Sequence, residues 1–230
     1  MPKDLSTTSS VKAFLAASKQ HLPNTQAQDK AKGRLLFAMD ATASREASWN
    51  MACQIQSDMF AAAAGLEISL CYYRGIGEFH SFPWSQNSTV LQKQMRSVCC
   101  LAGHTQIGQV LGHAVSQGSK QKMKAVVLVA DCFEESIDTI AHDAARLGLL
   151  GIPLFIFQEG YNSSAEKAFR HLSQLSNGAY CRFDENSLAQ LRELLAAVAS
   201  YAVGGVKALQ QHDQGKNALL KQLIKQLPAK

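Results

Sequence analysis

The chain lacks the features that mark membrane-bound, secreted or zinc-cluster proteins. No apolar run approaches the roughly 20 residues that span a bilayer, and the polar start MPKDLSTTSS has no signal-peptide core. The six cysteines show no repeated CxxC spacing, and adjacent Cys99 and Cys100 are poorly placed to pair with each other. We therefore expect a soluble, cytoplasmic protein with reduced thiols and no membrane partner.

Motifs for nucleotide binding and acyl transfer are missing as well. The sequence contains neither a G-x-x-x-x-G-K-S/T loop nor a G-x-S-x-G nucleophile turn. The formal net charge is +5, but Lys and Arg are spread along the chain and form no basic block. No aromatic-plus-basic signature of an RNA-binding sheet or a DNA-reading helix accompanies them. Nucleic acid is therefore not expected as a partner.

The composition is that of a globular protein with one main domain. The 230 residues are 47% hydrophobic and 18% charged, which is enough to bury one substantial core. Residues 1–32 are polar and predict an N-terminal extension, with a helical pattern at residues 11–20. Apolar and helical runs alternate over residues 33–203, the expected domain. Residues 204–230 predict a flexible linker and a short amphipathic helix at Ala218–Leu227.

The alternating runs predict an open α/β sheet. Strands are expected at Arg34–Asp40, Glu67–Gly75, Glu78–Trp84, Lys124–Asp131, Ile152–Gly160 and Ala179–Phe183. Helices are expected at Ser44–Ala64, Val90–Cys100, Ile107–Gln117, Ser136–Leu147, Ser164–Leu175 and Ser187–Val203. This alternation is typical of a doubly wound, mostly parallel sheet with helices on both faces. The third strand follows a two-residue link and contains Pro83, so it is expected to be antiparallel and at an edge.

Two of the expected strands end in an aspartate, Asp40 and Asp131. In an open parallel sheet the ligand site lies at the carboxyl ends of the strands, so these loops should converge. Thr42 and Ser44 follow the first aspartate, and Thr105 precedes a helix in an intervening loop. Two carboxylates and three hydroxyls form an all-oxygen set, which Mg²⁺ or Mn²⁺ prefers. The five residues predict a divalent-metal site with one open coordination position.

The D-x-T-x-S string of Asp40, Thr42 and Ser44, followed by Thr105 and the strand-terminal Asp131, resembles a known metal site. It is similar to the metal-ion-dependent adhesion site (MIDAS) of the von Willebrand factor A (vWA) family, D-x-S-x-S, then Thr, then Asp. The resemblance implies that the three hydroxyls bind the metal while the two aspartates act largely through waters. It also implies that an Asp or Glu of a partner protein completes the coordination.

The resemblance covers about Arg34–Val203 and includes the strand order with an antiparallel edge strand. The sequence departs from the family pattern at two positions. Thr42 stands where Ser is commoner, which keeps the hydroxyl and adds a methyl group. Cys132 follows Asp131 where the family often has glycine, which puts the conformation of the loop beside the metal in doubt.

A simpler interpretation is that these polar residues only support helices. Ser44 and Thr105 both precede helical segments, where a hydroxyl can cap the helix, and capping is compatible with metal binding. Glu134 and Glu135 suit the positive end of the helix that follows them. His104 is expected to be a solvated loop histidine that carries no specific role.

Three functions are open at this stage. The first is a module that binds a protein partner through the metal, without catalysis. The second is a metal-dependent, phosphatase-like hydrolase, because Asp40 after a first strand resembles hydrolases of the haloacid dehalogenase type; these need a second Asp where Thr42 stands. The third is a structural subunit with a vestigial metal site, which binds through Ala218–Leu227, although such a stripe more commonly packs on its own domain.

Overall fold

The computed structural model describes residues 33–50, 52–53, 65–184, 187–213 and 217–228. The predicted N-terminal extension, residues 1–32, lies outside the described residues. The helix predicted at Ser44–Ala64 falls only partly within them: a 3-10 turn, η1 (Ala43–Arg45), leads into helical residues 46–50 and 52–53.

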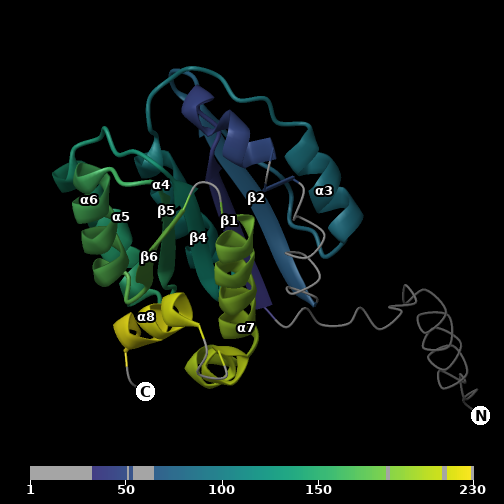
Figure 1. The fold of residues 1–230 in the computed structure, drawn as a ribbon, viewed down its shortest axis with the longest axis vertical. Helices are drawn as coiled ribbons and strands as arrows, with labels where there is room; N and C mark the ends of the chain where they lie inside the picture. Colours follow the sequence, from purple (N-terminus) through teal and green to yellow (C-terminus); the bar gives the residue numbers. More distant parts are fainter. Residues whose placement is uncertain (1–32, 51, 54–64, 185–186, 214–216, 229–230) are drawn as a thin grey trace, which may run out of the picture. The chain divides into compact units, whose positions relative to one another are not determined.

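The strands are β1 (Gly33–Asp40), β2 (Leu66–Arg74), β3 (Glu78–Ser81), β4 (Ala125–Ala130), β5 (Leu154–Glu159) and β6 (Ala179–Phe183). They form one sheet in the order β3-β2-β1-β4-β5-β6, shown in Figure 1. Every neighbouring pair is parallel except β2 and β3. The predicted doubly wound fold with an antiparallel edge strand is confirmed. Chain order reverses beside β1, and at such a switch point the connections diverge and leave room for a ligand.

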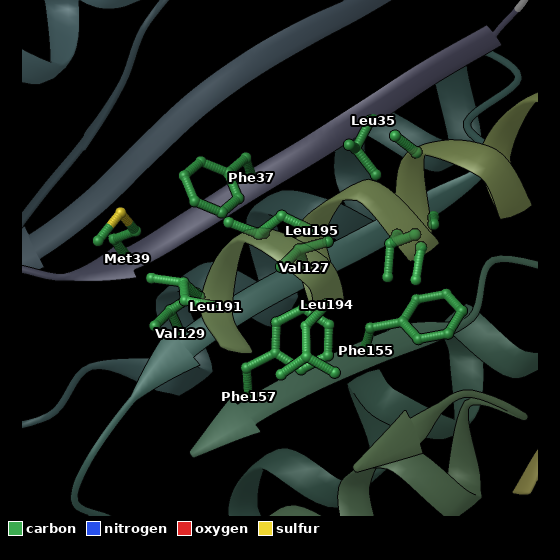
Figure 2. Packing of buried hydrophobic residues seen from close by; sticks show 14 of the residues in the cluster. Leu35, Phe37, Met39, Val127, Val129, Phe155, Phe157, Leu191, Leu194 and Leu195 are labelled. Carbon is green, nitrogen blue, oxygen red and sulfur yellow. The ribbon is translucent and has the colours of Figure 1, made fainter. Parts of the chain in front are cut away.

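Helices cover both faces of the sheet because its central strands bury side chains on both sides. On one face, side chains of β1 such as Phe37 pack beneath helices α3 (Ser88–Arg96) and α7 (Leu188–Asp213). Figure 2 shows Leu191, Leu194 and Leu195 of α7 over β1, β4 and β5. Alternate residues such as Leu36 enter the opposite core, under α4 (Ile107–Lys120), α5 (Ile137–Leu149) and α6 (Ser163–Leu175).

The C-terminal segment differs from the predicted flexible linker. Helix α7 does not end at Val203 but continues to Asp213, past a break at Gly205, whose φ is 69°. Helix α8 (Ala218–Gln226) then packs on β6 and α7. The leucines of its apolar face join the core beside the sheet: Leu220, Leu223 and Leu227. The amphipathic stripe therefore packs on its own domain, as expected for most such stripes.

Helix α3 ends earlier than predicted, and this frees a loop that reaches the sheet edge. The side chain of Asn87 accepts hydrogen bonds from the N–H groups of Thr89 and Val90, so the helix begins at Ser88. It ends at Arg96, and the chain beyond it reaches the turn after β1, where Leu101 forms a bridge with Thr42. Among the helices of the described ranges, none combines the length and apolar character needed to cross a bilayer.

Candidate metal centre

Four of the five predicted metal-site residues meet at the carboxyl edge of the sheet. Asp40 ends β1 and Asp131 follows β4, and these two strands are paired neighbours. The Ser44 hydroxyl donates a hydrogen bond to Oδ2 of Asp131 at 2.9 Å, and it lies 3.3 Å from Oγ1 of Thr42. Oδ1 of Asp40 accepts a hydrogen bond from the Thr42 N–H at 2.7 Å. The turn after β1 therefore brings two hydroxyls beside two carboxylates.

Asp40 is fully buried beneath this turn. Burial raises the pKa of its carboxyl, hydrogen bonds from Thr42 lower it, and the negative charge of Asp131 raises it further. The Tyr73 hydroxyl donates to Oδ2 of Asp40 at 3.0 Å, which holds the carboxyl in place. The negative charge of Asp131 beside the buried carboxyl of Asp40 favours a cation at this position.

Asp131 provides the test of whether this cluster suits a metal ion. Its Oδ2 accepts the bond from Ser44, whereas its Oδ1 is buried and has no hydrogen-bond partner among the described residues. A buried carboxylate oxygen without a partner is costly, and a hard cation satisfies it. The described residues contain no group of three or more His, Cys, Asp or Glu suited to a metal. A metal held here would take its remaining ligands from water and from hydroxyls such as those of Thr42 and Ser44.

The loop that carries Thr105 runs directly beside the turn after β1. Leu101 forms an isolated parallel bridge with Thr42, and its N–H donates to the Ala41 carbonyl at 3.0 Å. Gly103 lies so close to the β2–β3 turn that a Cβ there would sit 1.9 Å from the Gly75 carbonyl oxygen. Glycine is therefore required at position 103, and this close contact fixes the loop against β2.

The Thr105 hydroxyl is engaged away from the other four residues. It accepts a hydrogen bond from the Glu134 N–H at 3.0 Å, and the Thr105 N–H donates to Oε2 of Glu134, also at 3.0 Å. Within the described ranges, no hydrogen bond joins Thr105 to Asp40, Thr42, Ser44 or Asp131. Its role as a metal ligand stays a prediction.

Glu134 and Glu135 were expected to support α5, the helix that follows them. Their hydrogen bonds go instead to the Thr105 loop and to the start of α4. Glu135 accepts hydrogen bonds from the N–H groups of Ile107 and Gly108, at 2.5 and 2.8 Å. It therefore caps the start of α4, a different helix, while Glu134 holds the Thr105 loop. This bracing was missed because the contacts join segments that are distant in sequence.

The capping interpretation fails for Thr105, because the N-cap of α4 is Gln106 and its side chain forms no cap bond. The N-cap of η1 is Thr42, and the Ser44 hydroxyl contacts Asp131. The His104 side chain is 72% exposed, and its Nδ1 lies 3.6 Å from Oε2 of Glu134, in keeping with a solvated loop residue.

Sequence analysis missed one charged pair at this edge, Arg45 and Glu159. Arg45 directly follows Ser44 but is only 1% exposed, and it forms an ion pair with Glu159 at the end of β5. An arginine in a polar turn has the pattern of a surface residue, so nothing local indicated its burial. Glu159, which ends a buried strand as Asp40 does, was the available signal.

Comparison by sequence identifies no relative: no protein-family model matches the chain, and no curated protein matches it significantly. Solved structures do match. A von Willebrand factor type A protein from Catenulispora acidiphila is 13% identical, with a TM-score of 0.61 over 75% of this chain and 43% of that one. The VWA domain of SpRpn10 is 12% identical, with a TM-score of 0.54 over 70% of this chain and 94% of that one.

A third structure, proximal thread matrix protein 1 from the mussel byssus, has a zinc-occupied MIDAS motif. It is 12% identical, with a TM-score of 0.56 over 74% of this chain and 47% of that one. The chain thus spans less than half the length of this protein and of the Catenulispora protein. At such identities the likeness establishes the fold, which is that of a vWA domain.

Proposed function

We propose that this chain is a metal-dependent protein-binding module, in which Mg²⁺ or Mn²⁺ at the MIDAS-type site takes an Asp or Glu of a partner protein as its last ligand. The observation that carries this proposal is the buried, unpartnered Oδ1 of Asp131 within an all-oxygen cluster. The zinc-occupied MIDAS motif of the mussel protein supports a divalent ion in this fold.

In this proposal the chain's own residues hold the ion. Ser44 and Thr42 present hydroxyl oxygens, and Asp40 and Asp131 supply negative charge from two neighbouring strands. Thr105 would become a further ligand by exchanging its bond to Glu134. The bound cation supplies the positive charge that a partner's carboxylate recognises.

The surroundings suit recognition by another protein. The loop beside the site exposes residues 101–104, and Leu101 is 46% exposed next to Thr42. A hydrolase of the kind considered above needs a carboxylic acid where the Thr42 hydroxyl contacts Ser44, so we propose binding without catalysis. Cys71, Cys99, Cys100, Cys132 and Cys181 form no disulfide bond within the described residues, which agrees with a reducing compartment, and we propose the cytoplasm as the location.

The test uses the full chain and defined probes. Titration calorimetry with MnCl₂ and MgCl₂ should show one site, and Asp131→Asn should remove it. Asp138→Asn, an exposed aspartate in the first turn of α5, is the matched control and should bind as the unsubstituted chain does.

Partner chemistry is tested with an immobilised chain and a random peptide library. Peptides selected in Mn²⁺ should contain Asp or Glu, should dissociate in EDTA, and should lose binding when that acid becomes Asn or Gln. Selection of peptides without an acidic residue, or binding that survives EDTA, would contradict the proposal.

A further inference from the structure

The turn that carries Ser44 also carries a buried cation. The Arg45 side chain is 1% exposed, and its ion-pair partner Glu159 is 7% exposed. Nη1 of Arg45 donates to the Ser48 hydroxyl at 3.3 Å, and that hydroxyl in turn hydrogen-bonds Glu159. Arg45, Ser48 and Glu159 thus form a connected polar group that begins at the residue after Ser44.

This group lies at the same edge of the sheet as the metal-site carboxylates. Asp40, Asp131 and Glu159 end or directly follow β1, β4 and β5, which are consecutive in the sheet. Burial lowers the pKa of the Arg45 guanidinium, and the charges of Asp131 and Asp40 raise it. Arg45 is therefore coupled electrostatically to both metal-site carboxylates while its ion pair holds it on Glu159.

The carboxylates coupled to Arg45 outnumber it. Asp40 and Asp131 lie within electrostatic reach of the guanidinium and Glu159 is paired with it, so the three leave a negative charge that a divalent cation would offset. Among the buried side-chain atoms without a hydrogen-bond partner in the described structure are Nε and Nη2 of Arg45 and Oδ1 of Asp131. An arginine this close to the carboxylates competes with the metal for their charge.

We propose that Arg45 is a resident cation of the metal site, which keeps the carboxylate cluster folded before metal binds and lowers the site's affinity for divalent metal. This inference rests on the proposed function. Arg45 is a positioning residue held by Glu159, and it makes metal binding weaker and more readily reversed than the carboxylates alone would allow. The site is then regulated by metal concentration instead of being permanently filled.

The test is a set of four full-length chains titrated with MnCl₂ by calorimetry: unsubstituted, Arg45→Met, Glu159→Gln, and the double variant. Arg45→Met removes the competing charge and should tighten Mn²⁺ binding about tenfold. Glu159→Gln leaves Arg45 unpaired and should weaken binding. The double variant should bind more tightly than Glu159→Gln, because the same guanidinium is removed from it. Arg146→Met, at a 57% exposed arginine of α5, should change nothing.

The double variant keeps the test valid if Arg45→Met alone does not fold. Arg45→Met leaves Glu159 buried without its partner, whereas replacement of both members of a buried ion pair is often neutral or stabilising. If Arg45 had only a structural role, its loss would damage the site and weaken Mn²⁺ binding. Tighter Mn²⁺ binding in the Arg45 variants therefore points to charge competition. Unchanged or weaker binding in both comparisons would overturn the role of Arg45. If none of the four chains binds Mn²⁺, the proposed metal-binding function fails, and this inference fails with it.

Discussion

The Ser44 hydroxyl donates a hydrogen bond to Asp131, which lies 87 residues further along the chain. This bond joins the turn after β1 to the residue that follows β4. These two strands are the central pair of the sheet, and chain order reverses between them. The candidate metal centre is therefore built across two neighbouring strands, and its parts can be tested separately.

Asp131→Asn should abolish stabilisation by metal without destabilising the metal-free chain. The substitution removes the negative charge that raises the pKa of Asp40, so the metal-free variant should melt at or above the temperature of the unsubstituted chain. Saturating Mn²⁺ at about 100 times its Kd stabilises a one-site protein by about 2.7 kcal/mol. Differential scanning fluorimetry with and without MnCl₂ measures both effects. An upward shift with metal that persists in Asp131→Asn would contradict this assignment.

Gly103→Ala should displace the loop that carries Thr105. A Cβ at this position would overlap the Gly75 backbone, and backbone cannot yield as a flexible side chain does. We expect a loss of about 1–3 kcal/mol in the free energy of unfolding, measured by urea denaturation. The control is Gly112→Ala in α4, where the new Cβ would lie 3.7 Å from Oδ2 of Asp143, an ordinary contact. That change should be neutral or stabilise the helix by up to about 1 kcal/mol.

Gln226→Ala should loosen α8 from the edge strand. The Gln226 side chain accepts from the Tyr180 N–H at 2.9 Å and donates to the Tyr180 carbonyl at 2.8 Å, so it pairs with β6 as a neighbouring strand would. Loss of both bonds should lower the free energy of unfolding by about 1–2 kcal/mol. Gln222→Ala, at an exposed position of the same helix, should have little effect. Equal urea midpoints for the two variants would contradict this contribution.

His113 should make the fold less stable as the pH falls from 7.5 to 5.5. Burial lowers the pKa of His113, which packs against Phe79 with ring centroids 5.3 Å apart, and the charge of Lys120 adds to the shift. Because the folded pKa lies below the unfolded one, the unfolded chain binds the proton first, and this stability is lost as pH falls through about 6.5. Urea denaturation at both pH values should show a smaller loss for His113→Gln, and an unchanged loss for the 64% exposed His142→Gln.

Local sequence determined the elements of this protein and the location of its candidate site. Apolar runs of strand length predicted the six strands of the sheet, because a strand buried on both faces needs apolar side chains throughout. Asp40 and Asp131 were identified because each interrupts such a run at its carboxyl end. Thr42 and Ser44 follow in the same turn, so their proximity to Asp40 needed no knowledge of tertiary contacts.

Only the tertiary structure decided what the charged residues beside the site do. Arg45 and Glu159 pair across segments that are distant in the chain, and Glu135 caps α4 in place of the helix that follows it. Likewise α7 continues past Val203, because the C-terminal leucines join the core of the sheet. A charged side chain has the same local pattern whether it faces water or a buried partner. What separates the two cases is the free-energy cost of leaving the charged side chain unpaired in the protein interior. That cost arises only once the strands have come together and formed an interior.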